Sequence, residues 1–145
     1  AAIDPGGGNR TQVSVTDPNK TDLQPRPGHH YRSRRKGNQT NIWEVAGLWE
    51  KSKDLPVTEV PLDFFNQYLD KNFWFAQKNP PNLRNFLKHC IKVAEADLAY
   101  PIILDEDGKV LDGIHRLVKA YLMEEKTIKT VRFPVTPPPD RVEFD

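Results

Sequence analysis

The chain has 145 residues, a net charge of +1 and 37% hydrophobic residues, which suits one domain with an apolar core and is too short for two of ordinary size. It contains no apolar run of the roughly 18 to 20 residues that a membrane span requires. Its single cysteine, Cys90, excludes an intramolecular disulfide and a multi-thiolate zinc site. From the apolar pattern we expect no membrane partner, and from the cysteine count we expect a cytoplasmic protein.

The first forty residues differ in composition from the rest of the chain. They contain five of the eight glycines and carry seven Lys or Arg against three Asp or Glu, whereas the remainder carries fourteen against seventeen. We therefore predict a disordered basic tail over residues 1–40, and the absence of an initial Met leaves open that part of residues 1–8 is not native. Within the tail, a basic cluster is a candidate for nucleic-acid contact and otherwise a solvated arm; its members are Arg32, Arg34, Arg35 and Lys36.

The elements expected next are a helix over 41–52, an edge strand within 55–62 and a helix capped by Asp63. Apolar residues spaced by three and four from Leu83 to Leu98 then predict a long amphipathic helix, with Cys90 on its buried stripe. The Asp-Gly turn between residues 101–104 and 110–111 predicts a hairpin. Its acidic residues lack the spacing of a metal-binding loop, so we predict no metal ligand in the protein.

A helix is expected from about residue 113 to 124 and a strand over 127–135, before three prolines that predict an extended tail over 137–145. The chain therefore reads as an α+β domain over 41–136, with an N-terminal helical extension, a small mixed sheet and packed helices.

One segment has the residue types of an anion site, because it lies where a strand is expected to give way to a helix. A helix start presents unpaired N–H groups and favours negative charge. In Asp112-Gly113-Ile114-His115-Arg116, the glycine permits close approach of a ligand, Arg116 offers a planar fork for phosphate oxygens and His115 titrates near neutrality. Asp112 is expected to cap the helix or to orient a metal ion or hydroxyl group, and Lys119 to extend the positive patch. An alternative is an ordinary capped helix with exposed basic residues.

Four parts of the chain carry a resemblance to a known family: the runs 101–104 and 110–116, the small residue Ala120 and the strand expected at 128–133. Together they resemble the core of the ParB/sulfiredoxin superfamily, and residues 57–62 are similar to its first strand. This resemblance implies a nucleotide phosphate held at Gly113, Ile114, His115 and Arg116. Ile114 stands where sulfiredoxins have their catalytic cysteine, and the helix-turn-helix that follows this domain in partition proteins is not seen here. The motif is closer to that of free-serine kinases, in which an acidic residue early in the domain acts as the base, a role open to Glu59 or Asp63.

Two functions follow from these observations. The first is a nucleotide-binding enzyme, an NTPase, small-molecule kinase or ParB-like nuclease that uses ATP or CTP with Mg²⁺, with His115, Asp112 and Glu59 as catalytic residues. The second is a catalytically silent binding module that acts through a protein or DNA partner. The sequence does not choose between ATP and CTP and does not predict an oligomeric state.

Overall fold

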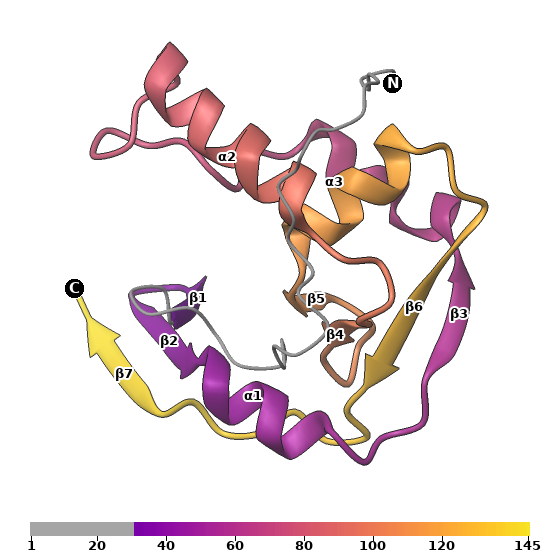
Figure 1. Ribbon diagram of the computed structural model, residues 1–145. Helices are drawn as coiled ribbons and strands as arrows, with labels where there is room; N and C mark the ends of the chain where they lie inside the picture. Colours follow the sequence, from indigo (N-terminus) through magenta and orange to yellow (C-terminus); the bar gives the residue numbers. More distant parts are fainter. Residues whose placement is uncertain (1–30) are drawn as a thin grey trace.

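The computed structural model describes residues 31–145, and the part of the predicted tail over residues 1–30 lies outside them. The described chain is α+β, as expected, with two small sheets and helices between and around them (Figure 1). Its elements in chain order are β1 (Tyr31–Lys36), β2 (Gln39–Glu44), α1 (Val45–Ser52), β3 (Thr58–Pro61), the 3₁₀ helix η1 (Leu62–Asp70), α2 (Leu83–Glu95), β4 (Ile102–Leu104), β5 (Val110–Asp112), α3 (Ile114–Leu122), β6 (Thr127–Arg132) and β7 (Arg141–Phe144).

The central sheet is mixed and has the strand order β3-β6-β4-β5. β4 and β5 form the predicted antiparallel hairpin, β6 runs parallel to β4, and β3 is an edge strand. A parallel neighbour cannot be reached by a tight turn, so the chain crosses over through α3 between β5 and β6. The start of α3 therefore lies at the edge of this sheet, directly after β5.

Successive residues of β4 point to opposite faces of the sheet and fill two separate cores. Ile102 and Leu104 pack with Phe65 of η1 and Leu117 of α3, whereas Ile103 packs on the other face with Trp43 of β2. Both faces are covered, which explains why β4 reads as a continuous apolar run rather than an alternating one.

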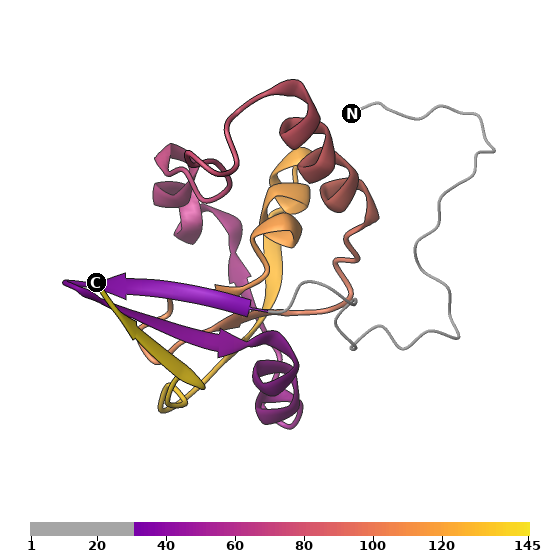
Figure 2. The ribbon, with the colours of Figure 1, turned by 90° about the vertical axis from the view of Figure 1, so that its left-hand side faces the viewer.

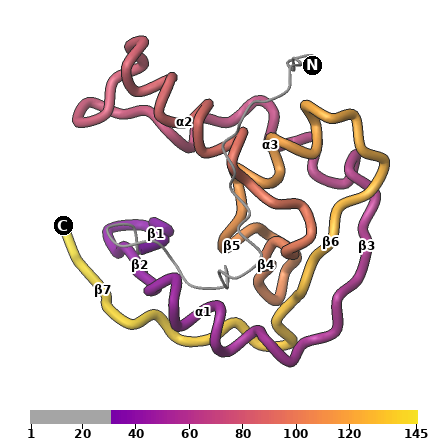
Figure 3. The backbone as a smooth tube through the Cα atoms, in the orientation of Figure 1, coloured from indigo at the N-terminus to yellow at the C-terminus, as the bar shows by residue number. Residues whose placement is uncertain are grey.

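The structure corrects the expectation for residues 31–40, which are not a disordered tail. They form β1 and the start of β2, which pair antiparallel with Tyr31 opposite Glu44 and Lys36 opposite Gln39. The helix expected over 41–52 begins only at Val45, because residues before it belong to β2. The C-terminal tail is also structured: β7 pairs with Gln39–Ile42 of β2 and completes the second sheet, in the order β1-β2-β7 (Figure 3).

Other boundaries differ by smaller amounts. The helix assigned to Asp63 as N-cap is the 3₁₀ helix η1, which follows Pro61 and has no side-chain cap. The strand expected over 127–135 ends at Arg132, and α3 spans 114–122 rather than 113–124. Among residues 31–145, no helix is long and apolar enough to cross a membrane.

The prediction of a buried apolar stripe on α2 is wrong. Val93 is buried, but Leu83 is 85% exposed and Cys90, expected in the core, is also exposed. Only one side of α2 packs, against α3, and the rest of its apolar surface faces outward at the edge of the molecule (Figure 2). Hydrophobic periodicity correctly predicted that α2 is a helix, but it did not determine how much of the helix the domain covers.

Candidate functional site

The residue before α3 has to be a glycine for reasons of packing. Gly113 has φ 123° and ψ 23°, a conformation that residues with a side chain rarely adopt. A Cβ atom at this position would lie 2.6 Å from Cγ2 of Ile102 in β4 and 3.2 Å from Nη2 of Arg116. Gly113 therefore allows the chain to leave β5 and start α3 in close contact with the sheet, and its carbonyl accepts the hydrogen bond of Leu117 N.

Asp112 does not cap α3; its buried carboxylate is held by three side chains. Oδ1 accepts a hydrogen bond of 2.8 Å from Arg32 Nε. Oδ2 accepts hydrogen bonds from Trp49 Nε1 at 2.9 Å and from Arg116 Nη2 at 3.2 Å. Burial raises the pKa of Asp112, but the charges of Arg32 and Arg116 oppose this and the pKa lies below the usual value, so the carboxylate is ionised at neutral pH.

Arg116 is a buried cation that the surrounding protein satisfies only in part. Its side chain is 12% exposed, and its guanidinium carbon lies 5.8 Å from the ring centroid of Trp49. Within residues 31–145, its Nε atom has no hydrogen-bond partner. Arg32 and Arg116 together exceed the charge of Asp112 by one, so the group formed by these three side chains has a net positive charge.

His115 is paired with a histidine that the sequence analysis did not identify. Its Nε2 lies 2.8 Å from Nδ1 of His89 on α2, and the indole of Trp74 lies over both rings, with centroids 5.0 Å and 4.3 Å away and ring planes within 10° of parallel. The pKa of His115 is lowered to about 3, mainly by burial and then by the neighbouring charges of His89 and Lys92. The pKa of His89 is also lowered, first by burial, so at pH 7 both imidazoles are neutral, and the N–H of one ring donates a hydrogen bond to the other ring.

A signal for His89 exists in the sequence, but it cannot be used without the fold. His89 and Val93 are one turn apart on α2, and both lie on the side that packs against α3. Because the apolar spacing of α2 indicates a different buried side, the sequence alone does not single out His89.

Two other predicted site residues lie apart from this group. Lys119 Nζ donates to the carbonyls of Ala94 at 3.0 Å and Ala96 at 2.6 Å, so it closes the C-terminal end of α2. Glu59 lies on β3, where it accepts a hydrogen bond from Thr127. β3 and β5 are opposite edges of the four-stranded sheet, which separates Glu59 from Asp112 by three strand spacings, or about 14 Å.

Three of the four basic residues predicted to contact nucleic acid form ion pairs with aspartates of the same chain. Arg32 binds Asp112, Arg34 forms a 2.5 Å ion pair with Asp105, and Arg35 pairs with Asp145 at the C-terminal end. Arg34 also donates to the carbonyl of Val110. These contacts tie β1 to the hairpin of the central sheet and bring Arg32 to the start of α3. No ion pair is found for Lys36 among the described residues.

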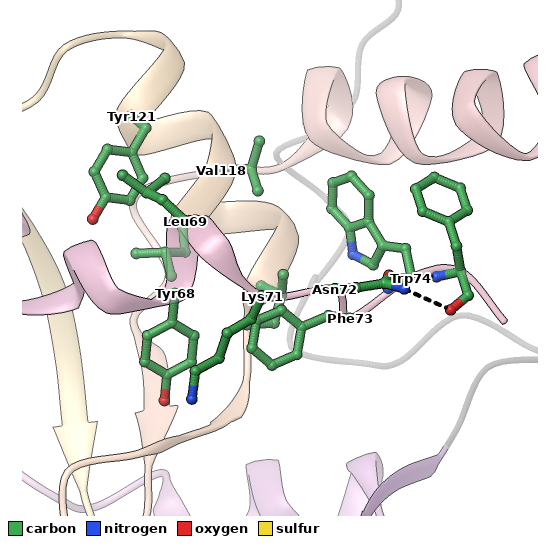
Figure 4. A pocket seen from close by; sticks show the side chains of 11 residues that line it. Tyr68, Leu69, Lys71, Asn72, Phe73, Trp74, Val118 and Tyr121 are labelled. Atoms are coloured by element: carbon green, nitrogen blue, oxygen red, sulfur yellow. Dashed lines mark hydrogen bonds between the residues drawn. The ribbon is translucent and has the colours of Figure 1, made fainter. Parts of the chain in front are cut away.

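An aromatic pocket of about 300 Å³ lies beside α3 (Figure 4). Asn72 shapes its rim, because its side-chain oxygen accepts hydrogen bonds from Trp74 N and Phe75 N. Trp74 lines this pocket and also covers the histidine pair, so the two features adjoin. The pocket is lined by Tyr68, Leu69, Lys71, Asn72, Phe73, Trp74, Phe75, Ile114, Leu117, Val118 and Tyr121.

Comparisons of the chain with protein-family models, with curated proteins and with solved structures found no match.

Proposed function

We propose that the start of α3 binds the phosphate groups of a nucleotide, ATP or CTP, and that the domain is a ParB-like nucleotide-binding enzyme. The observation that carries this proposal is Arg116, a buried cation at a helix start whose Nε has no partner within residues 31–145. A phosphate oxygen would supply the missing acceptor once the Arg116 side chain turns to expose this buried atom, and the N–H groups at the start of α3 would bind the same anion. The resemblance of residues 110–116 to the phosphate-binding turn of the ParB/sulfiredoxin superfamily supports a nucleotide as the source of that phosphate.

Arg32 is the second phosphate-binding group in this proposal. It is 40% exposed and reaches Asp112 from β1, so one side of its guanidinium remains open to a ligand. Asp112 orients both arginines and keeps them apart from each other, which is a positioning role. We assign Ile114 and His115 to phosphate binding through their backbone N–H groups.

For the reaction, we propose phosphoryl hydrolysis or transfer, or cleavage of a nucleic-acid phosphodiester, with the His115–His89 pair moving the proton. With a pKa of about 3, His115 is a weak base in the free protein, but the negative charge of a bound phosphate would raise this pKa. The pair would then accept a proton from an attacking water or hydroxyl group and share the resulting charge. Three side chains hold Asp112 and about 14 Å of sheet separates it from Glu59, so neither of these residues fits the role of base.

Residues 31–145 contain no cluster of side chains suited to a magnesium ion. Both oxygens of Asp112 accept hydrogen bonds, and its partners are two arginines and an indole N–H group, a donor set that repels a cation. A protein-bound magnesium ion therefore has no step in the proposed reaction. The cytoplasm supplies ATP and CTP, so we propose that compartment for this activity.

The hydrogen bonds to Asp112 also favour a second candidate function, a catalytically silent binding module. Asp112 is fully occupied by protein donors and is not available as a nucleophile or metal ligand. In that case nucleotide would bind at α3 without turnover, and the protein would act through a partner.

These functions are tested by calorimetric titration with ATP and CTP, with and without Mg²⁺, together with assays of phosphate release and nucleic-acid cleavage. Arg32→Ala should weaken binding by about tenfold or more, whereas the matched control Arg35→Ala, on the same strand, should not. His115→Gln should retain binding and lose turnover. Binding without turnover in the wild type would leave the silent module, and an absence of binding at millimolar nucleotide would rule out both.

A further inference from the structure

Among residues 31–145, nothing covers an apolar surface on helix α2, which we call the apolar face of α2. Its residues recur at helical spacing on one side of the helix, which forms an outer edge of the molecule in both views (Figures 1 and 2). They are Leu83 (85% exposed), Phe86 (53%), Leu87 (57%), Ile91 (47%) and the exposed Cys90. Five neighbouring apolar side chains of this size gain free energy by leaving water, so the face is suited to an interaction.

The charge around this face is strongly one-sided. Residues 71–95, up to the end of α2, contain five Lys or Arg and one acidic residue, Glu95, which gives +4 within a chain whose total is +1, so the other residues sum to −3. On α2 itself, Arg84 and Lys88 are one turn apart and border the apolar face on one side. We call these two residues the basic ridge of α2. A partner therefore has to offer an apolar phase next to negative charge.

A second copy of the chain fits this combination poorly. If two α2 helices met face to face and antiparallel about a two-fold axis, their basic ridges would lie on the same side of the contact and would repel each other. Single-stranded nucleic acid also fits poorly, because the apolar face has a single ring for base stacking, Phe86, and Leu83, Leu87 and Ile91 around it are aliphatic.

We propose that α2 is an interfacial helix that binds the surface of an anionic phospholipid bilayer. The apolar face would enter the boundary between headgroups and acyl chains, and the basic ridge would lie at the level of the lipid phosphates. Such binding needs no membrane-spanning segment, so it replaces the sequence-based expectation of no membrane partner. It uses the side of α2 that faces away from His89 and the nucleotide site at the start of α3.

The test is co-sedimentation of the full chain with vesicles of phosphatidylcholine alone, or with about one third phosphatidylserine. Binding should be at least about tenfold tighter to the anionic vesicles and should weaken with added salt. Leu83→Ser/Leu87→Ser and Arg84→Glu/Lys88→Glu should each reduce it by about tenfold or more. These side chains are exposed, so the variants should stay folded, as circular dichroism would verify.

Matched controls are Leu122→Ser, an apolar residue of α3 that is 49% exposed, and Lys129→Glu, an exposed cation of β6; both should bind vesicles like the wild type. A fluorophore on Cys90, the only cysteine of the chain, should shift its emission to the blue with anionic vesicles as its surroundings become apolar. The proposal is overturned if the wild type does not sediment with anionic vesicles, or if the α2 variants bind as well as the controls. A dimer in analytical ultracentrifugation that Leu83→Ser/Leu87→Ser dissociates, without a change in vesicle binding, would assign the face to a second copy instead.

Discussion

Gly113 is a residue whose replacement should clearly destabilise the fold. Gly113→Ala places a Cβ atom 2.6 Å from Ile102 in a backbone conformation that alanine rarely adopts, so it should lower the free energy of unfolding by about 2 to 4 kcal/mol. Gly37 is a control, because it also has a positive φ but nothing lies within 4 Å of its Cβ position. Urea denaturation should show a smaller loss for Gly37→Ala; equal losses would contradict the packing argument.

The histidine pair makes a prediction about pH. His115 has a pKa of about 3 in the folded protein against 6.5 for an unperturbed histidine, so the unfolded chain binds more protons between these values. Stability should therefore fall on acidification from about pH 6 to pH 4, by about 1 kcal/mol per pH unit, and His115→Gln should flatten this dependence. Thermal unfolding at several pH values measures it. A wild-type profile as flat as that of the variant would show that His115 is not buried as a neutral group.

At the scale of elements, Lys119 distinguishes a structural role from a binding role. In the structure its ammonium group closes the end of α2, whereas the sequence pattern placed it in the phosphate site. Lys119→Met keeps the aliphatic part of the side chain and loses the hydrogen-bond donor. It should therefore lower the free energy of unfolding by about 1 kcal/mol and speed hydrogen exchange of the backbone amides of residues 92–96. Nucleotide affinity should not change. If affinity falls while exchange is unaltered, the phosphate role is the correct one.

Several elements were predictable because a local signal determines them. The Asp-Gly turn predicted the β4–β5 hairpin, and Asp112-Gly113 correctly marked the passage from strand to helix. The outer surface of α2 was not predictable, because amphipathic spacing does not report how much of a helix the domain covers. His89 was missed for the same reason: it reaches His115 across 26 residues of sequence, and only the packing of α2 on α3 brings them together.

At the scale of the molecule, the sheet β1-β2-β7 joins both ends of the described chain to the central sheet. Trp43 Nε1 donates to the carbonyl of Pro137 at 2.8 Å, and Arg32 and Arg34 reach aspartates of the hairpin. Removal of residues 141–145 leaves the edge of β2 unpaired. It should lower the unfolding midpoint by about 5 °C or more and weaken nucleotide binding, because β1 carries Arg32. Calorimetry on the truncated chain tests both effects, and an unchanged midpoint would show that β7 adds nothing to stability.

This second sheet was hidden in the sequence by its composition. Arg32 and Arg34 lie two positions apart and point toward the body of the protein, which is strand periodicity, but charged residues at these positions read as a solvated arm. Three prolines likewise suggested that regular structure ends before β7 begins. β7 pairs with a strand about a hundred residues earlier, and the aspartates that Arg34 and Arg32 reach lie 71 and 80 residues away, so local propensity does not contain the information that decides these contacts.

The central claim is that the start of α3 binds nucleotide phosphate. It is tested most directly by following the backbone amide resonances of the ¹⁵N-labelled protein during titration with ATP, CTP and inorganic pyrophosphate. The account predicts that the backbone amide signals of Ile114, His115 and Arg116 shift most. The side-chain Nε–H signal of Arg32 should shift as well, whereas that of Arg35 should not. Saturable binding that leaves the residue 113–116 amides unshifted, or no shift at any residue at millimolar ligand, would contradict it.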